Sequence, residues 1–227
     1  TSHLSGSKIL VTAGPTREPI DPVRFMSNYS SGKMGYEIAL AAKNMGASVK
    51  LISGPVSLKS IKDVETEYVE TSEEMFNAVM SNADNFDILI STAAIADYKP
   101  KDYSKSKYKK NENDITIKFT RGADIISAAS KKNNNIYTVG FAAETEALEK
   151  NAQAKLVKKN LDMIVGNIAN HELKLGFESD FNEVIIFTRD KIQKIAKAKK
   201  SDIAAGILQA VSAEYSLKIK IVNKDVR

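Results

Sequence analysis

Apolar and polar positions along the chain follow two alternating patterns. Lys8 to Thr12 (KILVT) is a short apolar run that ends in Ala13-Gly14-Pro15, which is typical of a buried strand followed by a turn. From Gly32 to Met45 the apolar residues recur at the spacing of one helix face, and Gly46 is suited to end that helix. These two segments predict a first strand–helix unit.

The same alternation continues along most of the chain and predicts the fold class. Strands are expected at residues 48–53, 64–69, 86–90, 115–119, 136–141, 163–166 and 217–222, and helices at 72–80, 123–131, 146–160 and 202–215. Residues 183–195 resemble a β-hairpin. Strands that alternate with helices favour an α/β protein. The expected fold is a Rossmann-like, mostly parallel sheet with helices on both faces and a late β-hairpin excursion.

One domain is expected over residues 8–227, with a lysine-rich, mobile loop at 99–113. Residues 1–7 are mostly small and polar, as in a linker or a remnant of cloning, and they lack the apolar stretch of a signal peptide. No apolar run approaches the roughly 20 residues that are needed to span a bilayer. A cytoplasmic protein that does not contact membranes is therefore expected.

Composition excludes several kinds of chemistry. The chain has no cysteine, so disulfides, thiolate metal sites and a cysteine nucleophile are ruled out. His3 and His171 are the only histidines, and neither has a second ligand at metal spacing. A histidine zinc site or a Ser-His-Asp triad is therefore not expected. The net charge of +5 admits either a polyanion or a small anionic substrate, such as a nucleotide or a phosphate ester.

The loops that follow the predicted strands are the first places to look for a site, because ligands of open α/β sheets bind beyond the carboxyl ends of the strands. The first loop runs from Ala13 to about Ser31, is rich in polar residues and leads into the helix start Gly32-Lys33-Met34-Gly35. A helix start with serines and glycines can cradle a phosphate. The loop matches neither a Walker motif nor the G-x-G-x-x-G fingerprint. An ordinary long loop with an N-cap serine is the alternative.

Three further segments have both a functional and a structural interpretation. The small residues from Ser91 to Ala96 leave room for a flat ligand, and Asp97 can accept hydrogen bonds from a ribose or a base, although a packing contact explains them equally well. Lys107-Tyr108-Lys109-Lys110 is either a solvated charge run or a lid that brings an ammonium onto phosphates. Lys155 and Lys159 share a helix face, where they either extend along the edge of an apolar stripe or clamp an anion.

Taken together, these motifs closely resemble those of the bacterial phosphopantothenate–cysteine ligases, over nearly the whole chain. The matching segments are 14–24, 27–35, 53–56, 93–98, 107–110, 140–145, 159–162 and 176–182. The lysine motif is the mark of the CTP-using type, although Tyr108 stands where isoleucine is usual. The family often has Asn-Pro-Asp-Ile where this chain has Gly122-Ala123-Asp124-Ile125.

The resemblance implies a two-step reaction in coenzyme A biosynthesis. With Mg²⁺, 4′-phosphopantothenate and CTP give an acyl-cytidylate and pyrophosphate, and the amine of L-cysteine then displaces CMP to form 4′-phosphopantothenoylcysteine. The family is also dimeric and is commonly fused to a flavin-dependent decarboxylase half. The segment from Leu4 to Lys8 resembles the junction before the ligase half. No metal ligand is assigned in the chain.

The resemblance also implies roles for individual residues. Asn28 holds the acyl-cytidylate and supports its conversion, Arg24 belongs to the same site, and Lys107 serves the activation step. The expected nucleotide-binding residues, including those of the helix-start cradle, are Gly14, Ser30, Ser31, Gly32, Ser91, Thr92, Ala93, Asp97, Lys107, Ala123, Asp124, Ile125, Ile126, Phe141, Lys155 and Lys159.

Two other functions are compatible with the fold or the charge. A nicotinamide-dependent oxidoreductase would share the fold, but the chain lacks both G-x-G-x-x-G and a Tyr-x-x-x-Lys pair at a catalytic place. A nucleic-acid-binding module would suit the basic pI of about 9.1. Such a module needs a continuous basic face with interleaved aromatic residues, whereas these lysines are scattered.

Overall fold

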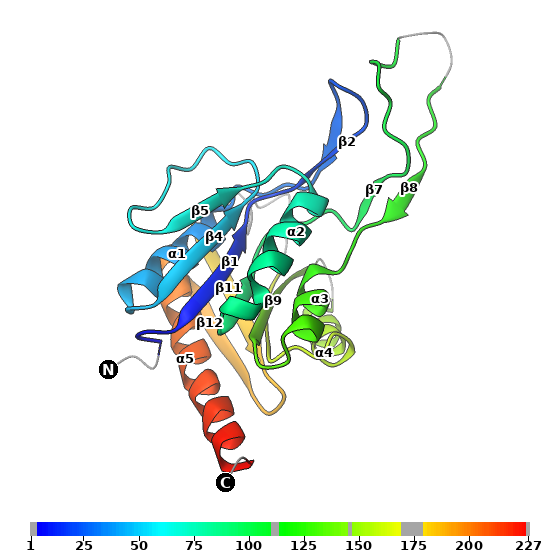
Figure 1. The fold of residues 1–227 in the computed structure, drawn as a ribbon. Coiled ribbons are helices and arrows are strands. Elements are labelled where there is room, and N and C mark those ends of the chain that lie inside the picture. Colours follow the sequence, from blue (N-terminus) through cyan, green and yellow to red (C-terminus); the bar gives the residue numbers. More distant parts are fainter. Residues whose placement is uncertain (1–3, 110–113, 145–146, 169–178, 226–227) are drawn as a thin grey trace.

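The protein is an α/β structure built on one eight-stranded sheet, as the computed structural model in Figure 1 shows. The structure describes residues 4–109, 114–144, 147–168 and 179–225. Along the sheet the order is β12-β11-β10-β9-β6-β1-β4-β5. These strands are β1 (Lys8–Ala13), β4 (Ser48–Ser53), β5 (Glu65–Tyr68), β6 (Ile88–Ser91), β9 (Tyr137–Glu144), β10 (Met163–Ile168), β11 (Phe181–Phe187) and β12 (Ile192–Lys199).

The sheet is mostly parallel, which confirms the predicted class. Six neighbouring strands of this sheet pair in parallel, in the order β10, β9, β6, β1, β4 and β5. Strands β11 and β12 add an antiparallel hairpin at one edge. The predicted late hairpin is therefore confirmed. It extends the main sheet rather than standing apart from it.

Helices cover both faces of the sheet, as expected (Figure 1). Helices α1 (Lys33–Asn44) and α5 (Lys200–Asp225) pack on one face, and α2 (Ser72–Asn82), α3 (Ile125–Lys132) and α4 (Leu148–Lys158) pack on the other. A short 3₁₀ turn, Ala83–Asn85, follows α2. Within β1, Ile9 and Val11 belong to one hydrophobic core and Leu10 to the other. A strand that is buried on both faces is continuously apolar, which is why KILVT identified it.

Two small antiparallel sheets extend from the carboxyl edge of the main sheet. β2 (Arg17–Pro19) pairs with β3 (Phe25–Ser27), and β7 (Tyr98–Pro100) pairs with β8 (Phe119–Arg121). The first of these sheets lies within the predicted long loop. The prediction of a core strand at 115–119 is wrong, because β8 begins only at Phe119 and pairs outside the main sheet. Ile115 and Phe119 are half exposed, so the alternation there has no core to face.

The strand predicted at 217–222 is also wrong, because α5 continues without a break to Asp225. The alternation in SLKIKIV has the period of a strand, but no glycine or proline separates it from the predicted helix that ends at Tyr215. Lys218 stands one helical turn after Tyr215, on the side of α5 that faces the sheet. Leu217 and Ile219 are 46% and 41% exposed. At the other end, Leu4 is fully buried, so packing begins before residue 8.

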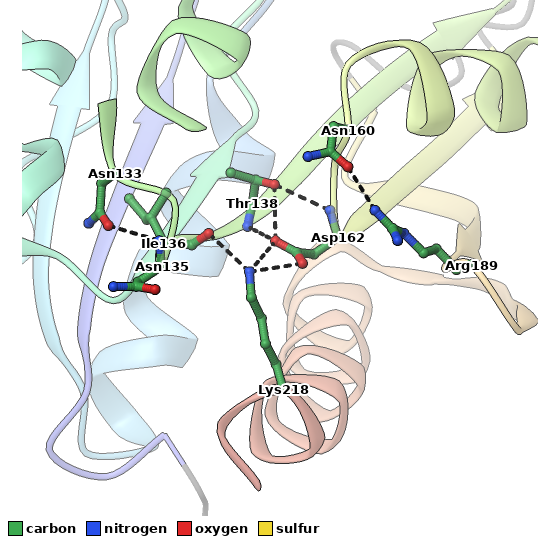
Figure 2. A network of polar contacts seen from close by, with 8 residues as sticks. All are labelled: Asn133, Asn135, Ile136, Thr138, Asn160, Asp162, Arg189 and Lys218. Carbon is green, nitrogen blue, oxygen red and sulfur yellow. Dashed lines mark hydrogen bonds and ion pairs between the residues drawn. The ribbon is translucent and has the colours of Figure 1, made fainter. Parts of the chain in front are cut away.

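Lys218 ties α5 to the amino ends of β9 and β10 (Figure 2). Its Nζ lies 3.0 Å from each carboxylate oxygen of Asp162 and donates to the carbonyl of Ile136. Asp162 also accepts from the Thr138 backbone N–H at 2.8 Å. The ion pair therefore joins a helix and two strands at the end of the sheet opposite to the strand carboxyl ends.

In the described ranges no helix has the length and apolarity to cross a membrane.

Tyr137 offers a test of how the core treats an unpaired polar atom. The ring is buried edge-on to Tyr215, and in the described part of the chain its hydroxyl has no hydrogen-bond partner. Burial, and then the charges of Asp162 and Glu214, raise the pKa of Tyr137. Because an unpaired buried hydroxyl is costly, Tyr137→Phe should raise the free energy of unfolding by about 1 kcal/mol in urea denaturation. Tyr215→Phe is the control, and a loss of stability in Tyr137→Phe would contradict the expectation.

Candidate functional site

A cavity of about 850 Å³ opens at the carboxyl edge of the sheet. Its walls come from the loops after β1 and β6, the starts of α1 and α3, one face of α4 and the ends of β9 and β10. This is where ligands of parallel α/β sheets bind, so the topology and the cavity agree. Most of the residues that the sequence singled out line it: Asn28, Ser30, Ser31, Gly32, Ser91, Thr92, Ala93, Asp97, Ala123, Asp124, Ile125, Ile126, Phe141, Lys155 and Lys159.

The start of α1 forms one wall of the cavity. Gly32 has a φ of 75°, a left-handed conformation that suits glycine, and a Cβ there would come 2.7 Å from Val56 Cγ1. The backbone N–H groups of Gly32 and Lys33 donate to the hydroxyls of Ser30 and Ser31, at 3.3 and 3.4 Å. The first turn holds no acidic residue. The helix therefore has no carboxylate of its own in the first turn to offset the positive end of its dipole.

Asn28 joins the loop after β1 to the loop after β6. Its Nδ2 donates to the carbonyls of Ala94 and Ile95, at 3.3 and 3.1 Å. Thr16 supports the same junction, because its hydroxyl accepts from the Ala96 backbone N–H at 3.1 Å. With its two donors directed at the backbone, the Asn28 carboxamide has its oxygen left to offer a ligand. That oxygen is an acceptor only.

The opposite end of the cavity combines apolar walls with cations. Phe141, Ile126 and Leu161 provide the apolar surface. Lys159 Nζ lies 3.0 Å from Asp124 Oδ2, and Asp124 caps α3 by accepting from the Ser127 N–H. Burial opposes ionisation of Asp124, but the bonds from Lys159 and Ser127 outweigh it and lower its pKa. A flat, polar-edged group such as a nucleobase matches this combination.

Arg24 and Lys107 do not line the cavity. Arg24 Nη1 donates to Asp21 Oδ2 at 2.6 Å and to the carbonyl of Tyr108 at 3.3 Å, and Asp21 accepts from the Tyr108 N–H. Figure 1 shows that the β2–β3 and β7–β8 sheets, which carry these residues, extend away from the main sheet. Gly14 does not line the cavity either, and its carbonyl accepts from the Ala94 N–H.

Asp21 connects these two excursions, the β2–β3 and β7–β8 sheets with the segments between their strands. Its side chain is fully buried and accepts from the backbone N–H groups of Val23 and Arg24 at 2.8 Å each. Burial works against ionisation, but the backbone donors and the Arg24 guanidinium outweigh it and lower the pKa of Asp21 to about 2. The carboxylate therefore stays charged at any physiological pH. The sequence analysis gave Asp21 no role, because a single aspartate in a loop carries no distinguishing pattern.

Several polar residues that the sequence motifs did not single out as site residues also line the cavity, among them Lys33, Asn182 and Lys200. Lys33 and Asn182 stand within the quoted motifs, so the motifs contained a signal for them. Lys200 belongs to the run KAKK, where nothing marks one lysine as buried.

The fold and the cavity define a Rossmann-like α/β protein with a candidate ligand site at the carboxyl edge of its sheet. The family model described as the DNA/pantothenate metabolism flavoprotein C-terminal domain matches residues 4–215. The chain belongs to this family.

Similar proteins agree with this assignment. The chain is 46% identical over 209 residues to the coenzyme A biosynthesis bifunctional protein CoaBC of Vibrio parahaemolyticus, which covers 91% of this chain and 52% of the relative. It is 44% identical over 215 residues to the protein of the same name from Bacillus subtilis, covering 94% of this chain and 53% of the relative. The chain thus spans about half the length of these curated relatives. The crystal structure of the C-terminal domain of a CoaBC protein superposes with a TM-score of 0.80 at 39% identity, covering 94% of this chain and 97% of that one.

Proposed function

We propose that this chain is a phosphopantothenate–cysteine ligase of coenzyme A biosynthesis that uses CTP. The observation that carries the proposal is the cavity itself, where a carboxylate-free helix start, Asn28 and an apolar wall with cations meet at one sheet edge. The 46% identity to a CoaBC protein over most of the chain supports it.

The proposed chemistry needs a leaving group rather than a protein nucleophile. In the first step a carboxylate oxygen of 4′-phosphopantothenate attacks the α-phosphorus of CTP, and pyrophosphate leaves. In the second step the neutral amine of L-cysteine attacks the acyl carbon, CMP leaves with the bonding electrons, and the amine gives up a proton. Catalysis then consists of positioning and of stabilising charge. This suits a chain without cysteine.

The contacts of Asn28 indicate how it would act in the second step. Because its N–H groups are bound to the Ala94 and Ile95 carbonyls, its oxygen is held rigidly at the cavity wall. An acceptor there can take a hydrogen bond from the attacking amine and orient its lone pair toward the acyl carbon. The nucleotide would lie with its base against Phe141 and its phosphates toward the start of α1.

Magnesium would enter with the nucleotide. The described ranges hold no group of three or more His, Asp or Glu side chains that could bind a metal. That fits a cation that keeps its waters and is held largely by substrate phosphates, where it would offset the charge of the triphosphate. The homodimer, the attached decarboxylase half and the cytoplasmic location stay predictions.

Nucleotide choice provides the direct test. CTP should support pyrophosphate release in the presence of 4′-phosphopantothenate far better than ATP does. The reason is that a cavity wall of backbone and fixed side chains discriminates bases by their hydrogen-bonding edges. Released pyrophosphate is measured with each nucleotide, with and without 4′-phosphopantothenate. Equal catalytic efficiency with CTP and ATP would refute the CTP assignment. No release with any nucleotide would refute the ligase.

A further inference from the structure

A second basic region lies at the end of the cavity away from the proposed base site. Lys33 is the first residue of α1, Lys200 is the first residue of α5, and Asn182 stands near the start of β11. All three line the cavity. Helices α1 and α5 cover the face of the sheet opposite to α3 and α4 (Figure 1). The cavity therefore has one basic end on each side of the sheet edge.

Lys200 is unusual because it is a lysine that is only 4% exposed. Lysine is almost never buried to this extent, since removing an ammonium from water is costly. Burial, and then the positive charge of Lys33, lower the pKa of Lys200 to about 8, although Asp180 acts in the opposite direction. Side chains whose surroundings disfavour their charged form are concentrated at functional sites.

Lys33 and Asp180 complete the region. Lys33 Nζ lies 2.6 Å from Asp180 Oδ1, and the Asp180 backbone carbonyl accepts from the Lys200 N–H at 2.9 Å. Lys33 and Lys200 thus bring two ammonium groups to this end of the cavity, beside the carboxylate of Asp180. The carboxylate-free first turn of α1 adds the positive end of a helix dipole to these ammonium groups.

We propose that Lys33, Lys200 and Asn182 form a phosphoryl-binding subsite at this end of the cavity, distinct from the base site between α3 and α4. Lysine ammonium groups supply charge, the Asn182 carboxamide supplies a neutral polar contact, and burial of Lys200 strengthens its attraction for an anion. The identity of the ligand rests on the proposed function. Two of the proposed substrates carry suitable groups: CTP has its β- and γ-phosphates, and phosphopantothenate has its 4′-phosphate.

Equilibrium binding to the full chain tests the subsite. Titration calorimetry is carried out with CTP, CMP, inorganic pyrophosphate, 4′-phosphopantothenate and pantothenate, without metal, on Lys200→Met and Lys33→Met. Each change removes a charge and keeps most of the side-chain length. Lys199→Met is the matched control, because Lys199 is an exposed neighbour that does not line the cavity. Thermal unfolding checks that each variant is folded. If Lys200→Met is not, Lys33→Met, whose side chain is 35% exposed, carries the test.

The pattern of lost affinity identifies the group that is bound. A subsite for the nucleotide tail predicts that Lys200→Met weakens CTP and pyrophosphate at least about tenfold and leaves CMP and 4′-phosphopantothenate unchanged. A subsite for the 4′-phosphate predicts the same loss for 4′-phosphopantothenate alone, with pantothenate and CTP unchanged. Lys33→Met should follow the same pattern. Asp180→Asn should tighten the same ligand, because it removes the carboxylate that neutralises Lys33.

The pH dependence separates binding by Lys200 from a structural role. Its ammonium must be protonated to attract an anion, so affinity in the parent protein should fall as the pH rises from 7 to 9. This fall should exceed that in Lys200→Met, which lacks the titrating ammonium. Unchanged affinity for all five compounds in both lysine variants, or weaker binding in Asp180→Asn, would overturn the subsite. If the parent protein binds these anions but makes no ligase product, the proposed function fails and the subsite stands.

Discussion

Asn28→Asp is expected to lower the rate of cysteine-dependent product formation by about two orders of magnitude or more, while pyrophosphate release persists at a reduced level. The substitution is nearly isosteric, but it places a carboxylate oxygen against the carbonyls of Ala94 and Ile95, to which the Asn28 amide now donates. The acceptor oxygen would no longer be held in place by these two hydrogen bonds, and the wall would gain a negative charge beside a phosphate-bearing intermediate. The second step should suffer more, because the acceptor orients the attacking amine.

A quench experiment with labelled CTP measures both steps. The acyl-cytidylate and CMP are resolved before and after L-cysteine is added, for Asn28→Asp and for the control Asn77→Asp on the exposed surface of α2. Accumulated intermediate that does not turn over is the expected result. Equal loss of activation and condensation would make Asn28 a general binding residue and would remove its assigned part in the second step.

Lys107→Gln should slow acyl-cytidylate formation by roughly two orders of magnitude, with a much smaller effect on CTP affinity. A lysine that meets the phosphates only as charge develops contributes roughly 3 kcal/mol to the transition state and little to the ground state. Lys107 is exposed and lies outside the cavity lining, so in this conformation it can add little to ground-state binding.

Single-turnover activation at saturating CTP measures the effect of Lys107. The control is Lys105→Gln, an exposed lysine of the same excursion outside the Lys-Tyr-Lys-Lys motif. An unchanged activation rate in Lys107→Gln would mean that the motif is a solvated charge run. A loss that is equal in the two variants would point to the total charge of the segment rather than to Lys107.

The hydrophobic pattern predicted the body of the fold because the central strands are buried on both faces and the helices on one. Strands such as β1 and β6 therefore appear as continuous apolar runs, and α1 appears with a clean helix period. The pattern failed where alternation was not caused by burial. The segments around Ile115 and Leu217 alternate like strands, yet one lies in an excursion and the other in the exposed part of a helix.

The candidate site was predicted in composition but not in all its geometry. The loops after β1 and β6 and the end of β9 meet at one sheet edge by topology alone, so residues such as Asn28, Asp97 and Phe141 were brought together as expected. The positions of Arg24 and Lys107 depend on side-chain contacts between two excursions, which no periodicity records. Lys200 depends on where α5 begins relative to β11, and that is a tertiary property.

Hydrogen bonds to Asp21 attach the two excursions to each other. Through it the backbone at Tyr108 is attached to residues 21–24, across 87 positions of sequence, and only three residues separate Arg24 from Asn28. A displacement of the lysine segment would therefore be transmitted along a short strand, β3, toward Asn28, the residue proposed to act on the intermediate. Activation and condensation would then both depend on the position of the lysine segment. Natural variation in the lysine segment should accordingly be constrained by both half-reactions.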